Sequence, residues 1–368
     1  MSPTVLHVVG ARPNFMKIAP IMRGLEAYDC EQLLVHTGQH YDPEMSDAFL
    51  RDLDMPQPTH HLGVGSGSRA EQTARILDQL PTILKTAAPR AVVVAGDVTS
   101  TLAAALATTF EDIPVVHVEA GLRSFDWSMP EEHNRLMVDH LSQLCLTHSA
   151  GADDNLVREG IEPSRIRLVG NTMIDSLFAH LTAAKRLAPH RELGLAERGY
   201  LLVTLHRPRV VDDPELLQRV LDALDALAEE IPVVFPVHPR TRARLDALRM
   251  RPTRARLLNP LGYLPFIGLE AAAKAVLTDS GGIQEETTAL GVPCFTLRDN
   301  TERPITCTEG TNQLIGTDPE AIPTILNRLA AQPRAPLPLW DGHAGARSAD
   351  AIAVLAELQA LQPGASPW

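Results

Sequence analysis

The sequence has few cysteines and no long apolar segment. Only four of its 368 residues are cysteines, and no two of them are closely spaced, so neither a disulfide framework nor a cysteine-rich zinc site is expected. No run approaches the roughly 18 apolar residues of a membrane span, and the first residues lack the basic and apolar regions of a signal peptide. We therefore expect a cytoplasmic protein that does not bind a membrane.

Positive charge is also scarce. The formal net charge is -12 at pH 7, which gives no electrostatic basis for non-specific binding of nucleic acid. A phosphate group must therefore be bound by a local site. With 45% hydrophobic and 21% charged residues, the composition is that of an ordinary globular protein, and 368 residues favour two domains over one.

Short apolar, β-branched runs alternate with longer helical patterns along the chain. Such runs are typical of parallel strands that helices cover on both faces. They form two series, which predicts an α/β fold with two doubly wound, Rossmann-like domains, 1–171 and 172–346, followed by a C-terminal helix, 347–362. The expected strands are 5–9, 32–37, 91–95, 114–119 and 165–170, and then 200–205, 232–237, 256–260, 275–279 and 293–297.

Ligands of doubly wound sheets bind at the carboxyl ends of the strands, so the residues that follow each run are of most interest. A glycine turn with Arg12 follows the first run and leads into a helical pattern. Free N–H groups of a helix N-terminus together with an arginine suit a phosphate. Because the pattern is not GxGxxG, a purely structural loop is about equally plausible.

Three carboxylates fall at the same predicted edge of the first sheet. Asp97 and Glu119 each follow a strand, and Glu131 opens a helical pattern beside Glu132. Helix capping and the helix dipole explain such acids individually, but three together suit proton removal and donation. Arg135 stands four residues after Glu131 and is expected to pair with it.

The second half contains the strongest single motif, TDSGGIQEE over residues 278–286. After a strand, Ser280, Gly281 and Gly282 can offer hydroxyl and backbone donors to a diphosphate. Glu286, expected in the first turn of the following helix, can accept hydrogen bonds from ribose hydroxyls. A structural tight turn is the alternative.

Other candidates in this half also follow predicted strands. His206 and His238 stand at two strand ends, and Arg303 is a second cation for a phosphate. Phe266 is expected on a loop, where it either stacks on a base or packs into the core.

The motifs GARPNFMKIAP, GDVTST, HVEAGLRS, PEEHNR, VTLHRP, LTDSGGIQEE, NTERP and EGTNQLIGTD run in this order from residue 10 to about 318. Together they resemble the non-hydrolysing UDP-N-acetylglucosamine 2-epimerases. This resemblance implies a GT-B arrangement with a cleft between the domains, a last helix packed on the first domain, a homodimer, and a UDP-sugar substrate. It implies C2 epimerisation through a glycal, without a metal or another cofactor. The implied catalytic residues are Asp97, Glu119, Glu131 and His206, and the implied substrate-binding residues are Arg12, Lys17, Arg135, His238, Phe266, Ser280, Gly281, Gly282, Glu286 and Arg303.

Two segments depart from the family pattern. The family's TRPE turn is here Ala11–Asn14, and its HRRE segment is His206–Arg209 with the sequence HRPR. Because the second segment helps bind an activating substrate molecule in regulated members, we expect no substrate activation here. The identity of the substrate is not decided by the sequence: UDP-N-acetylglucosamine, UDP-glucose and UDP-acetamido-uronic acids all remain candidates. A GT-B glycosyltransferase or a catalytically silent nucleotide-sugar sensor are the alternatives to an epimerase.

Overall fold

The computed structural model describes residues 2–38, 50–329 and 337–361, except the side chain of Arg12. The chain forms two compact units. Unit 1 comprises Met1–Ser176 with Pro338–Trp368, and unit 2 comprises Leu177–Leu337. The sequence placed the first division after residue 171, whereas the structure places it after Ser176, within the long helix α7 (Thr172–Leu187).

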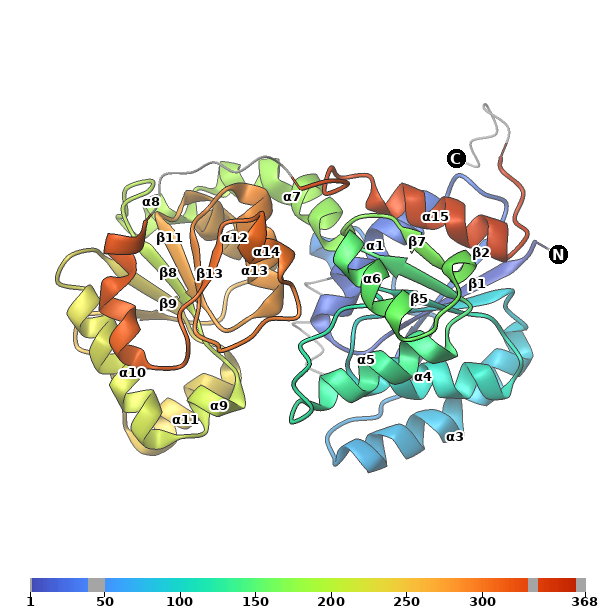
Figure 1. Cartoon of the computed structure of the whole chain (residues 1–368), viewed down its shortest axis with the longest axis horizontal. Coiled ribbons are helices and arrows are strands. Elements are labelled where there is room, and N and C mark those ends of the chain that lie inside the picture. The colour runs from blue at the N-terminus through green and yellow to red at the C-terminus, as the bar shows by residue number, and fades with distance from the viewer. Residues whose placement is uncertain (1, 39–49, 330–336, 362–368) are drawn as a thin grey trace. The chain divides into compact units, whose positions relative to one another are not determined.

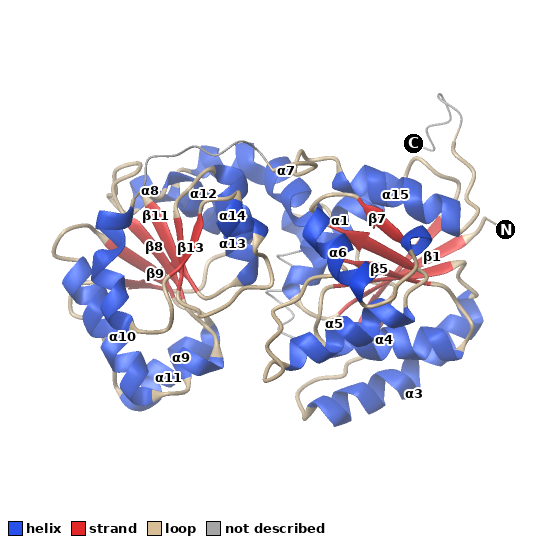
Figure 2. Cartoon of the chain, viewed as in Figure 1, coloured by secondary structure: helices blue, strands red, loops and turns tan. Residues whose placement is uncertain are grey.

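Unit 1 is built around a seven-stranded parallel sheet with the order β3-β2-β1-β4-β5-β6-β7. Helices cover both faces of this sheet (Figures 1 and 2), as a doubly wound fold requires. Its elements are β1 (Thr4–Val9), α1 (Arg12–Leu25), β2 (Glu31–His36), β3 (His60–His61), α3 (Arg69–Ala87), β4 (Ala91–Ala95), α4 (Thr99–Phe110), β5 (Val115–Val118), α5 (Pro130–Leu141), β6 (Leu144–Thr147), α6 (Ala150–Arg158), η1 (Pro163–Arg165), β7 (Ile166–Leu168) and α15 (Ala344–Leu355).

Unit 2 repeats this plan with a six-stranded parallel sheet, β10-β9-β8-β11-β12-β13. The predicted fold class, two Rossmann-like α/β domains, is therefore confirmed. The elements are α8 (Pro189–Glu192), β8 (Leu201–Thr204), α9 (Pro208–Val211), α10 (Pro214–Leu227), β9 (Val233–Pro236), α11 (Pro239–Leu248), β10 (Arg256–Leu258), α12 (Tyr263–Ala272), β11 (Ala275–Thr278), α13 (Gly281–Leu290), β12 (Cys294–Thr296), α14 (Ile305–Thr308), β13 (Asn312–Leu314) and η2 (Pro319–Arg328).

The central strands have the burial that their sequences predicted. All five residues of β4 in unit 1 are buried, and so are all four residues of β11 in unit 2. Valines of β4 pack with Ile76 and Leu80 of α3 and with alanines of α4. Because both faces of these strands are covered, their carboxyl ends are fixed within each unit, and the residues that follow them are held in place.

The last helix packs against the first one, which puts the end of the chain on unit 1 (Figure 1). A Cβ on Gly345 would lie 2.4 Å from the Pro20 carbonyl oxygen, and a Cβ on Gly24 would lie 2.9 Å from that of Gly345. Two glycines therefore allow close backbone approach of α15 to α1.

The C-terminal helix is shorter than predicted, since it ends at Leu355 and not at residue 362. Glu357 has a left-handed φ of 54°, and the N–H of Leu358 donates to the Ala353 carbonyl oxygen. This is the hydrogen-bond pattern that ends many helices. Ala360 then pairs with Tyr28 in an antiparallel bridge, so the chain leaves the helix to run beside unit 1.

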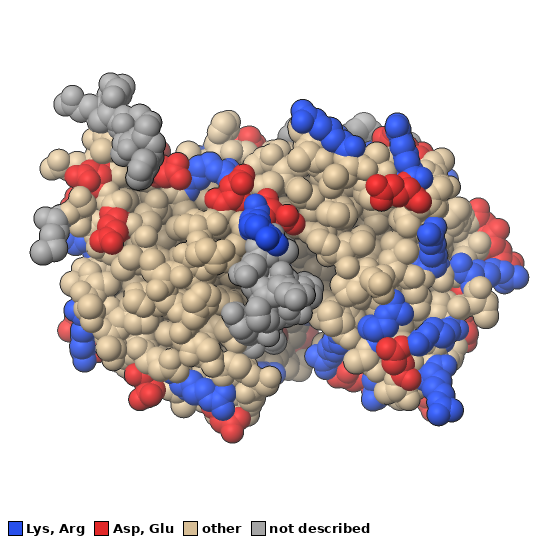
Figure 3. Space-filling view, turned by 180° about the vertical axis from the view of Figure 1, so that it is seen from behind, with Lys and Arg blue, Asp and Glu red and all other residues tan. Residues whose placement is uncertain are grey.

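The described helices include none that is both long enough and apolar enough to cross a membrane. On the face shown in Figure 3, the described Lys and Arg side chains lie among Asp and Glu side chains and form no continuous basic surface.

Candidate active site

In unit 1, the turn after β1 is fastened to the end of β4 by Asn14. Its Oδ1 accepts hydrogen bonds from the N–H groups of Gly10 (3.1 Å) and Ala11 (2.9 Å), and its Nδ2 donates to the Ala95 carbonyl oxygen (2.7 Å). Arg12 begins α1, but its side chain lies outside the described residues. The departure from the family's turn thus has a structural role here, because the asparagine in fourth place caps the turn.

Lys17 and Glu119 form an ion pair at the carboxyl edge of the sheet. Both side chains are 9% exposed. A Cβ on Gly96 would lie 2.9 Å from Lys17 Nζ, so the glycine after β4 leaves room for this ammonium group. Glu119 itself has a left-handed φ of 69°, which is uncommon for a side-chain-bearing residue and is found preferentially at functional sites.

Asp97 is held by Arg135, which reaches it from α5. Arg135 Nη2 lies 2.8 Å and Nε 3.0 Å from Asp97 Oδ2. The same guanidinium group pairs with Glu132, one turn away on α5. The expected pair between Arg135 and Glu131 is therefore wrong: the arginine lies toward the buried face of α5, which Glu132 shares and Glu131 does not.

Glu132 is a buried structural acid, whereas Glu131 is half-buried. The Glu132 carboxylate accepts hydrogen bonds from Ser124 N (3.0 Å), Ser124 Oγ (2.9 Å) and Phe125 N (2.9 Å). Among the described residues, no hydrogen bond or ion pair engages the Glu131 carboxylate. Glu131 is thus the acid of this helix start that is available to a ligand.

A second buried network, which sequence reasoning missed, supports the same edge. His117 of β5 bonds Asp139 Oδ1 through Nδ1 (2.6 Å) and approaches the Gly96 carbonyl oxygen through Nε2 (2.9 Å). Asp139 also accepts from Arg123 Nη2 (2.7 Å). Burial would raise the pKa of Asp139, but His117 and Arg123 outweigh it and lower that pKa. This network fixes the Gly96 turn that precedes Asp97.

A small cavity of about 10 Å³ adjoins Lys17 and Glu119, a volume near the minimum for one water molecule. His148, after β6, and Asn171, after β7, also line it. Asn171 Nδ2 is buried without a hydrogen-bond partner among the described residues. His148 and Asn171 each follow a strand, so the expectation that ligands bind at the carboxyl ends of strands includes them. The sequence did not predict β6, and His148 was therefore missed.

In unit 2, the end of β8 is tied to the end of β11. Asp279 Oδ2 accepts from the backbone N–H groups of His206 (2.9 Å) and Arg207 (2.7 Å), and Oδ1 lies 3.0 Å from His206 Nδ1. Burial would raise the pKa of Asp279, but the His206 ring and these N–H groups outweigh it and lower that pKa. The His206 ring is also 5.5 Å from the ring of His238, the N-cap of α11.

The N-terminus of α13 has features suited to a phosphate. Gly281 and Gly282 begin this helix, and its N-cap, Ser280, makes no side-chain capping hydrogen bond. A Cβ on Gly281 would lie 2.5 Å from Arg303 Nη1, which places the guanidinium group against the helix start. Arg303 also lies 3.1 Å from Glu285 Oε1, so its orientation is fixed.

Two predicted placements in this unit are wrong in detail. Phe266 lies in the helix α12 and not on a loop, and it packs half-buried against a core that includes Leu202 and Ile283. Glu286 is in the second turn of α13 and not in the first. The helix α12 begins at Tyr263, where a loop was expected, and α13 begins at Gly281, earlier than expected; the ends of helices are their least certain part.

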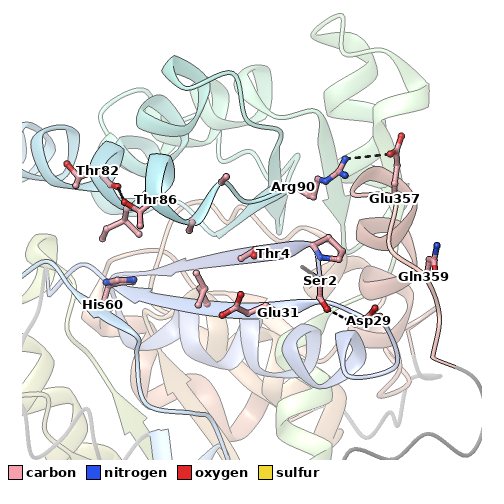
Figure 4. A pocket seen from close by; sticks show the side chains of 15 residues that line it. Ser2, Thr4, Asp29, Glu31, His60, Thr82, Thr86, Arg90, Glu357 and Gln359 are labelled. Carbon is pink, nitrogen blue, oxygen red and sulfur yellow. Dashed lines mark hydrogen bonds and ion pairs between the residues drawn. The ribbon is translucent and has the colours of Figure 1, made fainter.

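A much larger cavity, of about 1040 Å³, opens at the opposite edge of the unit 1 sheet. Figure 4 shows its lining from Thr4 and Glu31, at the amino ends of β1 and β2, with Arg90 and Glu357 paired nearby. No predicted site residue lines it. In the described parts of the chain, no group of three His, Cys, Asp or Glu side chains is arranged to hold a metal ion.

Comparison with known proteins gives consistent matches over nearly the whole chain. The family model described as UDP-N-acetylglucosamine 2-epimerase matches residues 24–353. The UDP-N-acetylglucosamine 2-epimerase of Methanocaldococcus jannaschii is 40% identical over 336 residues, which cover 87% of this chain and 92% of the relative. The UDP-2,3-diacetamido-2,3-dideoxy-D-glucuronate 2-epimerase of Pseudomonas aeruginosa is 39% identical over 317 residues, covering 85% and 88%.

A solved structure agrees with these sequences. The crystal structure of Methanocaldococcus jannaschii UDP-GlcNAc 2-epimerase in complex with UDP-GlcNAc and UDP matches with a TM-score of 0.88 and 37% identity, over 95% of this chain and 99% of that one. The shared sequence, the shared fold and the polar residues at the strand ends lead to one conclusion: the chain belongs to the UDP-N-acetylglucosamine 2-epimerase family, a family of isomerases.

Proposed function

We propose that this protein interconverts UDP-N-acetylglucosamine and UDP-N-acetylmannosamine by inverting carbon 2 of the sugar. The observation that carries the proposal is the set of carboxylates at one edge of the unit 1 sheet, in a chain of this family. Asp97 is fixed by Arg135, Glu119 is fixed by Lys17, and Glu131 has no partner in the described part of the chain. Three acids so placed exceed what binding alone requires.

We assign nucleotide binding to unit 2. The free N-terminus of α13 and Arg303 suit the diphosphate, and Glu286 suits the ribose hydroxyls. Phe266, at the start of α12, is the candidate to contact the base. His206 is 38% exposed at its side chain and oriented by Asp279, which supports a role on the phosphate or as a further acid.

In the proposed reaction, the hydrogen on carbon 2 is removed as a proton while the C1–O bond to the diphosphate breaks, giving a glycal and UDP. UDP then adds back at carbon 1, and carbon 2 receives a proton on the opposite face. Cationic groups near the diphosphate stabilise the charge that grows on it, which is commonly a large part of catalysis. Asp97, Glu119 and Glu131 together move the protons. We expect a homodimer that needs neither a metal nor an added cofactor.

The test is proton NMR of the purified protein with UDP-N-acetylglucosamine in deuterated water. We expect deuterium at carbon 2 of the sugar and the appearance of the manno isomer, with traces of glycal and UDP. A UDP-acetamido-uronic acid is the second candidate substrate, because the Pseudomonas aeruginosa relative carries that activity in its name. Exchange with that sugar alone would change the substrate and keep the reaction, whereas absence of exchange with both would refute the epimerase.

A further inference from the structure

Two glutamates are buried together in the apolar core of unit 2, outside its ion pairs. Glu270, on α12, is 0% exposed and Glu286, on α13, is 3% exposed. Both Glu270 carboxyl oxygens and Glu286 Oε1 lack a hydrogen-bond partner among the described residues. Leu269, next to Glu270, and Ile283, one helical turn before Glu286, belong to the surrounding apolar cluster. An unpartnered carboxylate in such surroundings is costly, so the pair needs a proton or a ligand.

Among the described residues, the ionisable groups nearest this pair supply no positive charge to it. Tyr263 of α12 lies near both acids, and burial raises the pKa of its hydroxyl well above the usual value. Cys294 of β12 is near Glu270, and burial raises the pKa of its thiol to about 12. Glu285, next to Glu286, is ion-paired with Arg303. Farther out, the His180 ring lies 6.1 Å from that of Tyr263.

Their surroundings raise the pKa of both acids. Burial, and then the nearby Glu286, raise the pKa of Glu270 well above its usual value. Burial and Glu285 raise the pKa of Glu286 to about 8, although the nearby Tyr263 hydroxyl opposes this shift. Burial therefore favours the protonated form of both acids, and a carboxylate on Glu286 further favours the proton on Glu270. A neutral carboxylic acid has one O–H to donate, whereas a carboxylate only accepts.

We propose that Glu270 is a positioning residue of the nucleotide site: it keeps its proton, donates it in a hydrogen bond to Glu286, and so holds the Glu286 carboxylate ready for the two ribose hydroxyls. This inference rests on the proposed function, in which Glu286 binds the ribose. The single proton serves both acids, since it removes the second buried charge and gives a donor to the unpartnered Glu286 Oε1. Without Glu270, the same carboxylate would lie in an apolar core with fewer donors.

This arrangement predicts a bell-shaped dependence of UDP affinity on pH. Below about pH 8 Glu286 is protonated in the free protein, and ribose binding must release that proton, so affinity rises by about tenfold per pH unit. At higher pH Glu270 ionises, the donor is lost and two like charges face each other, so affinity falls. The diphosphate also titrates near neutral pH, which makes a ligand without ribose hydroxyls a necessary reference.

The experiment is calorimetric titration of the full chain with UDP and with 2′,3′-dideoxyuridine diphosphate between pH 6 and 9.5. The proteins are the wild type, Glu270→Gln, which keeps a donor but cannot ionise, and Glu270→Leu, which has neither property. We expect Glu270→Gln to match the wild type up to about pH 8 and to lack the alkaline fall. We expect Glu270→Leu to bind UDP at least about tenfold more weakly at pH 8, the scale of one hydrogen bond to a charged group, with dideoxy affinity unchanged.

In turnover at pH 8, Glu270→Leu should raise KM and leave kcat within about twofold, because Glu270 belongs to unit 2 and the proton-transferring carboxylates belong to unit 1. Glu270→Gln should keep the wild-type KM at this pH. Equal alkaline behaviour of the wild type and Glu270→Gln, or equal pH profiles for UDP and the dideoxy ligand, would overturn the role of Glu270 while leaving the epimerase intact. Failure of UDP to bind the wild type at any pH would instead refute the proposed function. If Glu270→Leu does not fold, the Glu270→Gln comparison still decides.

Discussion

At the scale of single residues, neighbouring acids have very different surroundings. Glu131 and Glu132 are adjacent, yet Glu132 is buried under Ser124 and Arg135 while Glu131 is half-buried and unengaged in the described structure. Asp97, 26% exposed at its side chain, is both fixed by Arg135 and accessible. A proton-transferring group must be accessible to its substrate, which distinguishes Asp97 and Glu131 from the structural Glu132; Asp97 is in addition fixed by Arg135.

Replacing either accessible acid by its amide should abolish chemistry without unfolding the protein. We expect Asp97→Asn and Glu131→Gln each to lower kcat by at least about 100-fold, the scale of losing a general acid or base. Their thermal transitions should stay near that of the wild type, since neither carboxylate is deeply buried. The initial rate at which one UDP-sugar isomer is converted into the other is measured by NMR or by chromatography.

The matched controls are Asp154→Asn and Glu162→Gln, which make the same chemical changes at exposed positions of unit 1. Both should retain wild-type kcat within about twofold, because substitutions at exposed positions outside the candidate site usually have small effects. Rates close to wild type in both Asp97→Asn and Glu131→Gln would show that other groups transfer the protons.

At the scale of elements, the sequence predicted strands best where they are apolar on both faces. The run 91–95 corresponds to β4 residue for residue, and each other predicted strand overlaps an observed one. Three strands were missed: β3 is two exposed histidines, β13 reads NQL, and β6 reads LCLT without a β-branched aliphatic residue. Periodicity and β-propensity give little signal for such short or polar segments, whose pairing depends on the rest of the sheet.

The candidate site was predictable in its residues but not in its pairings. Asp97 and Glu119 follow recognisable strands, so the parallel sheet places them at one edge. Which acid pairs with Arg135 depends on the rotation of α5 about its axis. The spacing i,i+4 predicted Glu131, but Arg135 and Glu132 lie together on the buried face of the helix. Glu270 carries no motif at all, and only the packing of α12 against α13 makes it relevant to Glu286.

The contact of α15 with α1 gives a prediction on stability. We expect Gly345→Ala to destabilise the protein by about 1–3 kcal/mol, the usual cost of overpacking, because the new Cβ would meet the backbone of Pro20. Gly151→Ala, at an α6 position with nothing within 4 Å, should stabilise by up to about 0.5 kcal/mol through helix propensity. Urea unfolding compares the two alanines directly, and equal effects would show that α15 is not held closely to α1.

At the scale of the whole molecule, the same doubly wound plan occurs twice with different residues at the carboxyl edge. Unit 1 has the accessible acids Asp97 and Glu131, whereas unit 2 has the helix start at Gly281 beside Arg303. One fold with two sets of edge residues fits a division of labour between sugar chemistry and nucleotide binding, since function resides in the residues grafted on a fold and not in the fold itself.

That division predicts where UDP protects the chain from hydrogen exchange. At 100 times its Kd, a ligand stabilises the state that binds it by about 2.7 kcal/mol, so amides that exchange by opening of unit 2 should slow by up to about 100-fold. We expect the strongest protection in α13, measured by mass spectrometry with and without UDP, and less in α4 of unit 1. In Gly281→Val, whose side chain would press on Arg303, the same UDP concentration should protect α13 little. Protection confined to unit 1 would place the nucleotide there and reverse the assignment of the two units, because a bound ligand slows exchange chiefly in segments that can open only after the ligand has dissociated.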